Sequence, residues 1–139
     1  MGQKVGLACI IDDDKIYVNL VKKIIEIKQL SENLLIYKNG KEALDYFEHI
    51  LGNMTEDRLP EIIFLDLNMP VMDGWEFLNE FIKIKNYFNK KITLYVVSSS
   101  IDPRDLERAK SINLVTDYLI KPIELKKFEK IFERTIPAA

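Results

Sequence analysis

Residues 5–14 read VGLACIIDDD, an apolar run that stops at three consecutive aspartates. A buried strand of a parallel sheet has this pattern, because both of its faces are covered and polar residues begin where it leaves the sheet. Comparable apolar runs occur at residues 34–37, 62–65, 92–97 and 116–120. We therefore predict five strands, of which the third ends at Asp66 and the fourth runs into Ser98.

Longer segments with apolar residues three or four positions apart separate the predicted strands, and this spacing is the period of a helix. We expect helices over residues 15–28, 42–51, 75–88 and 124–132, and one more that opens at Asp102 or Pro103. The apolar stripe of the first helix comprises Ile16, Leu20, Ile24 and Ile27, and that of the last Leu125, Phe128, Ile131 and Phe132. Asn39-Gly40 is interpreted as a turn and residues 52–59 as a loop. Five strand–helix pairs predict one doubly wound α/β domain with a parallel sheet.

Composition narrows the class of protein. The 139 residues are 47% hydrophobic and 30% charged, which is typical of one soluble globular domain. A formal net charge of -2 argues against a strongly cationic nucleic-acid-binding protein. The single cysteine, Cys9, fits a reducing compartment, and no apolar run approaches the ~20 residues that span a bilayer. We expect a cytoplasmic protein that contacts neither membrane nor nucleic acid directly.

Polar side chains stand at the carboxyl ends of several predicted strands, where open parallel sheets bind their ligands. These residues are Asp12, Asp13, Asp66, Asn68, Ser98 and Lys121. Crowded carboxylates repel one another unless a cation neutralises them, and an all-oxygen site suits Mg²⁺ and also Mn²⁺. Beside such a metal, Lys121 and Ser98 would complete a site for a phosphoryl group. We choose Asp66 as the nucleophile because it stands alone at a strand end.

Four motifs together resemble the signature of response-regulator receiver domains. They are residues 10–13 (IIDD), 65–70 (LDLNMP) with Asp73-Gly74, 97–99 (VSS) and 118–122 (YLIKP). They follow the order and spacing usual in that family and cover nearly the whole chain. The resemblance implies a flavodoxin-like (βα)5 fold with strand order 2-1-3-4-5. It also implies that residues 1–139 form a single receiver domain, with a core of about 5–135 and no output domain.

The resemblance further implies a role in two-component or phosphorelay signal transduction. Asp66 would accept a phosphoryl group from a phosphohistidine on a sensor histidine kinase or a histidine phosphotransfer protein. Mg²⁺ would be held by Asp13, Asp66, the main-chain carbonyl of Asn68 and, largely through water, Asp12. The protein would be a phosphoacceptor with at most slow autodephosphorylation, not an enzyme.

Ser98 and Tyr118 take the two switch positions of the family. Phosphorylation would draw the Ser98 hydroxyl and Lys121 toward the phosphoryl group, and Tyr118 would then move inward into the space vacated. An unknown protein partner would read the change on the face made by the fourth helix, the fifth strand and the fifth helix. A phosphorylation-dependent homodimer is a further option. The Lys121-Pro122 peptide is expected to be cis.

Two alternatives stay open. One is a receiver-like interaction module that has kept the fold without the chemistry. The other is an Asp-nucleophile phosphohydrolase, against which Asn68 counts, because such enzymes place a second acid at that position. Some residues also have plainer interpretations: Asp12, Asp13 and Asp14 as helix caps, and Tyr118 as a half-buried strand tyrosine.

Overall fold

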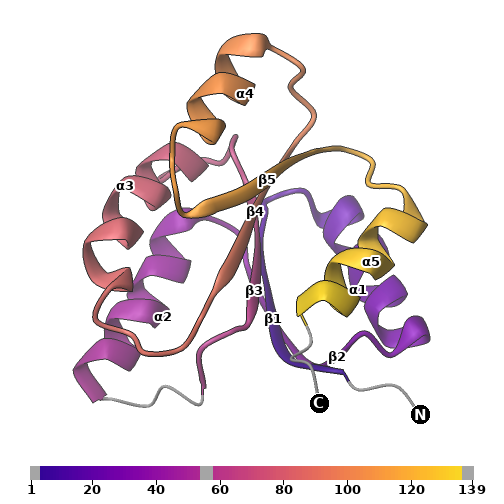
Figure 1. Ribbon diagram of the computed structural model, residues 1–139, viewed down its shortest axis with the longest axis horizontal. Coiled ribbons are helices and arrows are strands. Elements are labelled where there is room, and N and C mark those ends of the chain that lie inside the picture. The colour runs from indigo at the N-terminus through magenta and orange to yellow at the C-terminus, as the bar shows by residue number, and fades with distance from the viewer. Residues whose placement is uncertain (1–3, 54–57, 136–139) are drawn as a thin grey trace.

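The computed structural model describes residues 4–53 and 58–135, and these residues form a five-stranded parallel sheet with helices on both faces (Figure 1). The strands are β1 (Val5–Ile11), β2 (Ser31–Tyr37), β3 (Ile62–Asp66), β4 (Thr93–Ser98) and β5 (Val115–Ile120). Their order is β2-β1-β3-β4-β5, and every neighbouring pair is parallel. The predicted fold class and strand order are therefore confirmed.

Five helices follow the strands in alternation. They are α1 (Lys15–Lys28), α2 (Gly40–Asn53), α3 (Gly74–Lys85), α4 (Pro103–Lys110) and α5 (Leu125–Thr135). In Figure 1, α1 and α5 cover one face of the sheet, while α2 and α3 cover the other. No helix within the described ranges combines the length and apolar character needed to cross a lipid bilayer.

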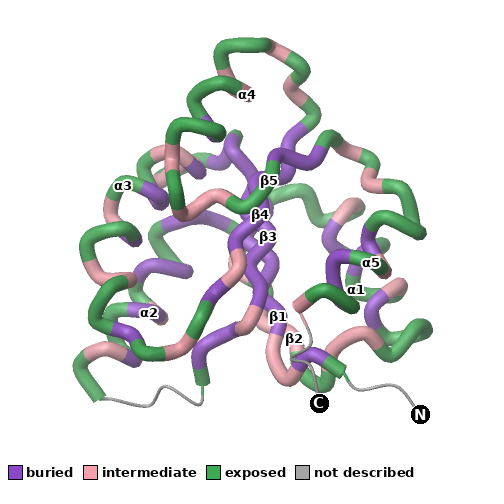
Figure 2. Tube along the Cα trace, in the orientation of Figure 1, coloured by how far each residue is buried: buried purple, intermediate pink, exposed green. Residues whose placement is uncertain are grey.

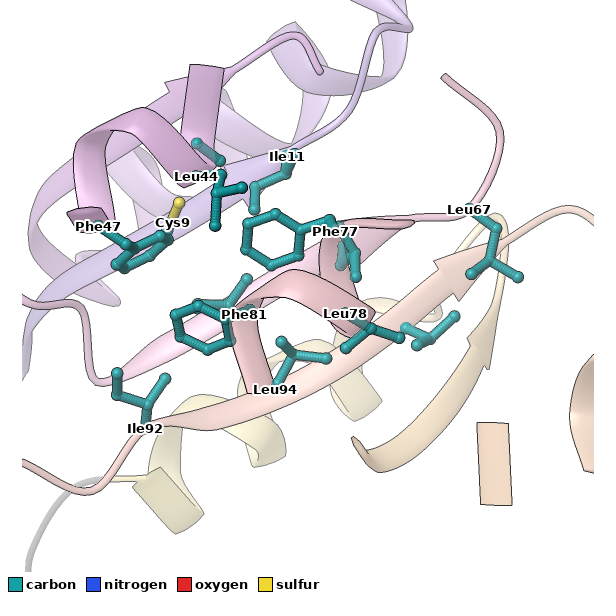
Figure 3. Packing of buried hydrophobic residues seen from close by; sticks show 14 of the residues in the cluster. Cys9, Ile11, Leu44, Phe47, Leu67, Phe77, Leu78, Phe81, Ile92 and Leu94 are labelled. Carbon is teal, nitrogen blue, oxygen red and sulfur yellow. The ribbon is translucent and has the colours of Figure 1, made fainter. Parts of the chain in front are cut away.

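The core consists of two hydrophobic layers, one on each face of the sheet. All five residues of β3 are buried, and they alternate between the layers: Ile62 and Phe64 face α1 and α5, whereas Ile63 and Leu65 face α2 and α3. This explains why the strand is an uninterrupted apolar run. The central strands are buried along most of their length in Figure 2. Aromatic rings of α2 and α3 interlock in one layer, with Phe47 and Phe81 centroids 4.8 Å apart (Figure 3).

The buried face of α1 differs from the apolar stripe that the sequence pattern indicated. Ile16, Leu20 and Ile27 are 84%, 55% and 72% exposed. The buried residues are instead Val18, Val21 and Ile25. Apolar residues occupy both sides of this helix, so their spacing gives the period but does not decide which side meets the sheet. In α5, Leu125 is 41% exposed and was wrongly predicted to be buried, whereas the rest of the predicted stripe is buried.

Several boundaries also shift. Strand β2 begins at Ser31, before the predicted residue 34. Helix α2 begins at Gly40, before the predicted residue 42, because Asn39 caps a helix where a turn was predicted. The Asn39 Oδ1 atom accepts the backbone N–H of Glu42 at 2.9 Å, as an N-terminal cap does. Helix α2 also takes the first residues of the predicted 52–59 loop, of which residues 54–57 lie outside the described ranges. Helix α3 ends at Lys85, before the predicted end at residue 88.

Candidate functional site

The acidic residues predicted from the sequence meet at the carboxyl edge of the sheet. Asp12 follows β1 directly and Asp66 is the last residue of β3, the strand that pairs with β1. Asp12, Asp13 and Asp66 each offer a carboxylate oxygen within 4.8 Å of the others. Asp12 and Asp66 are buried, whereas Asp13 is exposed. The site thus combines two buried carboxylates with one that solvent reaches.

Lys121 brings a positive charge into this group of carboxylates. It directly follows β5, and the Lys121-Pro122 peptide bond after it is cis, as predicted. Its Nζ atom lies 2.8 Å from Asp12 Oδ2 and 3.7 Å from Asp66 Oδ1. The same ammonium lies 4.4 Å from the centroid of the Tyr17 ring, a contact that the sequence analysis missed. The signal available in the sequence was weak: Tyr17 is an aromatic residue in the first turn of the helix that starts at the site.

Burial and crowding disturb the acidity of the group. Burial raises the pKa of Asp66 from its ordinary 3.8 to about 6, and the charge of Asp12 adds to this rise while Lys121 opposes it. Burial likewise raises the pKa of Asp12, against the hydrogen bond from Lys121. One ammonium therefore leaves three carboxylates with excess negative charge. A site of this kind gains from a second cation.

Asp14 caps α1, in agreement with the plainer interpretation of the three aspartates. Its Oδ1 atom accepts the backbone N–H groups of Ile16 and Tyr17, both at 3.1 Å. Asp12 in turn accepts the N–H of Asp14 at 3.0 Å, which fixes the turn between β1 and α1. Capping thus explains one of the three consecutive aspartates. Asp12 and Asp13 remain for the site.

The loop between β3 and α3 is folded tightly against Asp66. A Cβ atom added to Gly74 would lie 2.4 Å from the carbonyl oxygen of Asp66, so only glycine fits there. Asp73 caps α3 in a capping box with Glu76. Val71, at the tip of the loop, has a φ of 71°, which is an uncommon backbone conformation for a β-branched residue. The motif Asp73-Gly74 therefore serves to anchor the loop that follows the candidate nucleophile.

The two predicted switch residues meet at the loop between β4 and α4. Ser98 is fully buried, and its Oγ atom accepts the N–H of Ser100 at 3.1 Å. The Tyr118 hydroxyl donates to the carbonyl oxygen of Ser100 at 2.9 Å. Tyr118 is buried in this structure, and its movement on phosphorylation stays a prediction.

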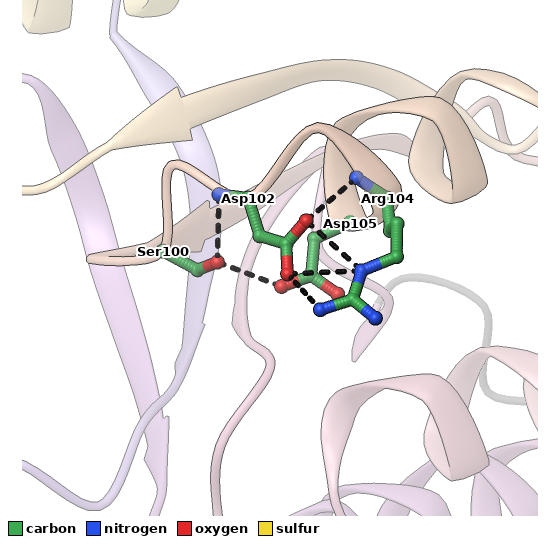
Figure 4. Close-up of polar contacts among 4 residues, drawn as sticks. All are labelled: Ser100, Asp102, Arg104 and Asp105. Carbon is green, nitrogen blue, oxygen red and sulfur yellow. Dashed lines mark hydrogen bonds and ion pairs between the residues drawn. The ribbon is translucent and has the colours of Figure 1, made fainter.

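Ser100 connects this loop to α4. Its hydroxyl donates to Asp105 Oδ2 at 2.7 Å and accepts the N–H of Asp102 at 3.2 Å (Figure 4). Asp102 caps the helix by accepting the N–H of Arg104 at 2.9 Å, as the sequence predicted. The two contacts of the Ser100 hydroxyl were not predicted from the sequence. Their only signal was the run of three serines at a strand end.

The chain also matches a known protein family. The model of the response regulator receiver domain matches residues 8–133 of the chain. The chain belongs to this family. The "probable methanogenesis regulatory protein FilR2" of Methanothrix harundinacea is 30% identical over 125 residues, which cover 89% of this chain and 77% of that protein.

Solved receiver-type structures superpose along almost the whole chain. A two-component response regulator from Cytophaga hutchinsonii has a TM-score of 0.83 at 28% identity, covering 96% of this chain and 98% of its own. The Mn²⁺-bound form of response regulator Rcp1, a protein known from Synechocystis, has a TM-score of 0.71 at 26% identity, covering 93% and 90%. The receiver domain of this protein thus places its acidic group in a fold that holds a divalent metal in Rcp1.

Proposed function

We propose that this receiver domain is a phosphoacceptor of two-component or phosphorelay signalling, with Asp66 as the residue that takes the phosphoryl group. The observation that carries the proposal is the grouping of Asp12, Asp13 and Asp66 within 4.8 Å, with the Lys121 ammonium 2.8 Å from Asp12. The phosphodonor would be a phosphohistidine of a sensor histidine kinase or a histidine phosphotransfer protein, and the reaction would take place in the cytoplasm.

The donor set fits Mg²⁺, or Mn²⁺ in its place. Both ions prefer oxygen ligands, and the three carboxylates carry more negative charge than Lys121 balances. Asp13 and Asp66 would hold the ion together with the main-chain carbonyl of Asn68, and Asp12 would act largely through water. The bound ion would supply positive charge for the phosphoryl oxygens. The Mn²⁺-bound form of Rcp1 supports this assignment.

The chain's own residues would act as follows. An Asp66 carboxylate oxygen attacks the phosphorus atom, the bond from phosphorus to the donor imidazole nitrogen breaks, and its electron pair stays on that nitrogen. Lys121 neutralises charge on the transferred group. Ser98 Oγ already accepts the N–H of Ser100, which leaves its own proton for donation to a phosphoryl oxygen.

The signal would leave the site through the loop between β4 and α4. Ser98 contacts Ser100, and Ser100 contacts both Tyr118 on β5 and Asp105 on α4. A shift of Ser98 toward the phosphoryl group would therefore be transmitted to α4 and β5, two elements of the α4–β5–α5 face. A protein partner, or a second copy of the chain, would bind this face according to its state.

Radiolabelled phosphotransfer from a phosphorylated histidine kinase tests the proposal. Wild type should acquire label that requires Mg²⁺ and disappears with a chelator, and Asp66→Asn should acquire none. Asp45→Asn is the matched control, because Asp45 is an exposed aspartate of α2. Equal labelling of wild type and Asp66→Asn would refute the phosphoacceptor assignment. Absence of both label and Mg²⁺ binding in wild type would favour a receiver-like interaction module.

A further inference from the structure

We propose that Tyr17 is a positioning residue for phosphoryl transfer, whose ring face holds the Lys121 ammonium in the site. The inference rests on the proposed function, since it assigns Lys121 a partner in that reaction. Its basis is the 4.4 Å distance between Lys121 Nζ and the centroid of the Tyr17 ring. An ammonium within about 6 Å of an aromatic face is attracted by the negative potential of the ring.

The ring differs in kind from the other two contacts of this ammonium. Asp12 Oδ2 and Asp66 Oδ1 lie 2.8 Å and 3.7 Å from Nζ, and both belong to the carboxylates grouped for a cation. A divalent ion at those carboxylates would compete with Lys121 for their negative charge. It would not compete for the ring face. Of these three contacts, the one with Tyr17 can therefore persist when the carboxylates are engaged.

The position of the ring is fixed from two sides. On the α1 side, the backbone N–H of Tyr17 donates to Asp14 Oδ1 at 3.1 Å, so the cap of the helix holds the backbone from which this side chain extends. On the α5 side, Tyr17 lines a small apolar cleft with Pro122 and Ile123, the two residues after Lys121. The ring packs against the hydrophobic layer under α1 and α5. A ring held in this way can restrict the ammonium, which a flexible surface tyrosine could not do.

A purely structural contribution of Tyr17 makes a different prediction. Packing in the cleft needs an apolar side chain of similar size, which leucine supplies, whereas attraction of an ammonium needs an aromatic face. Tyr17→Leu and Tyr17→Phe therefore separate the two interpretations. Tyr87→Leu is the control for loss of a tyrosine elsewhere, because Tyr87 is 72% exposed.

The first measurement needs neither metal nor phosphodonor. In NMR spectra of the lysine-labelled protein, the ε-methylene protons of Lys121 should be shifted upfield by the ring in wild type and in Tyr17→Phe. The shift should be lost in Tyr17→Leu and kept in Tyr87→Leu. Lys121 protons at ordinary lysine positions in wild type would overturn the inference, whatever the outcome at Asp66.

The second measurement is the rate at which phosphoramidate labels Asp66 in saturating Mg²⁺. Tyr17→Leu should lower the rate about ten-fold, and Tyr17→Phe should restore most of it. In a Lys121→Met background, Tyr17→Leu should have an effect of less than about two-fold, since the residues act through one contact. An equal loss in both backgrounds, or none in either, would overturn the inference. A wild type that takes no label would refute the proposed function and with it any contribution of Tyr17 to transfer, while the NMR shift would still report the contact.

Discussion

Carboxylates and ammonium groups meet at both ends of this sheet, but in different proportions. At the amino end, Glu61 directly precedes β3. One of its carboxylate oxygens lies 3.3 Å from Lys90 Nζ, and the other accepts the N–H of Gly6 at 2.7 Å. Lys90 also donates to the carbonyl oxygen of Leu59 at 2.9 Å. Each oxygen of this carboxylate therefore faces a donor, and the cluster ties the beginnings of β1, β3 and β4 together.

At the carboxyl end, Asp12, Asp13 and Asp66 share one ammonium. The charge there is not balanced, and the pKa of Asp66 rises to about 6 as a result of burial and of the neighbouring charge of Asp12. The contrast shows that the same types of side chain have different effects at the two ends of the sheet. Where donors match acceptors, the cluster stabilises the fold. Where carboxylates are in excess, their repulsion lowers the stability of the fold and favours binding of a cation.

The largest expected effect separates the two lysines. Lys121→Ala should lower the rate of Asp66 phosphorylation by about 100-fold or more, because the group that neutralises the transferred phosphoryl is lost. Lys90→Ala, at the other end of the sheet, should change that rate by less than about two-fold. Initial rates of labelling with phosphoramidate measure both variants. A comparable loss of labelling rate in the two variants would mean that Lys121 affects phosphorylation only by stabilising the folded protein.

The second effect concerns stability at the acidic end. The folded state of Asp66 has a pKa of about 6 against an ordinary 3.8, so the folded protein holds this proton more tightly than the unfolded chain. The contribution of Asp66 to the free energy of unfolding is therefore close to zero well below pH 3.8 and becomes destabilising as the pH rises toward 6. Asp66→Asn removes this cost and should be more stable than wild type at pH 7.5 by roughly 2 kcal/mol in the absence of divalent ions.

Urea unfolding in EDTA measures this difference. The advantage of Asp66→Asn should shrink as the pH falls from about 6 and should vanish only well below 3.8, where the wild-type carboxyl is protonated in both states. A variant less stable than wild type at pH 7.5 would show that the carboxylate is well accommodated without a metal. The contrast between the two ends would then fail.

Glu61→Ala should act in the opposite direction. It leaves the partly buried N–H of Gly6 without this acceptor and removes one of the partners of Lys90, so we expect a loss of about 1–2 kcal/mol at pH 7.5. The rate of Asp66 phosphorylation should stay within about two-fold of wild type. Urea unfolding and phosphoramidate labelling on the same preparation test both halves. A variant of unchanged stability would mean that the cluster at the amino end is not structural.

The sequence predicted the site better than it predicted the faces of the helices. Asp12, Asp66 and Lys121 come together because parallel strands end at one edge and because β1, β3, β4 and β5 are neighbours. The apolar runs predicted that edge, and the family resemblance supplied the strand order. The buried side of α1 does not follow in the same way. Apolar residues line both sides of that helix, and contact with the sheet buried Val18 and left Ile16 exposed.

Contacts between side chains of different elements could not be predicted from the sequence, for a related reason. The distance from the Tyr17 ring to Lys121 depends on how α1 lies against the end of β5, and no local pattern encodes that. The burial of Tyr118 depends likewise on the path of the loop between β4 and α4. The sequence could predict which residues lie at the end of a strand or helix. It could not predict which residues of other elements their side chains contact.

The smallest effect tests whether the loop between β4 and α4 is already arranged before phosphorylation. Tyr118→Phe removes the hydrogen bond of 2.9 Å to the carbonyl oxygen of Ser100 and should cost about 1 kcal/mol. If that bond is present whether or not the site is occupied, the loss is similar in the free protein and in the protein with Mg²⁺ and beryllofluoride, a phosphoryl mimic; this is the outcome we expect. A loss confined to the beryllofluoride form would mean that Tyr118 lies outward until the site is occupied, and the loop would then belong with the unbalanced carboxyl end of the sheet.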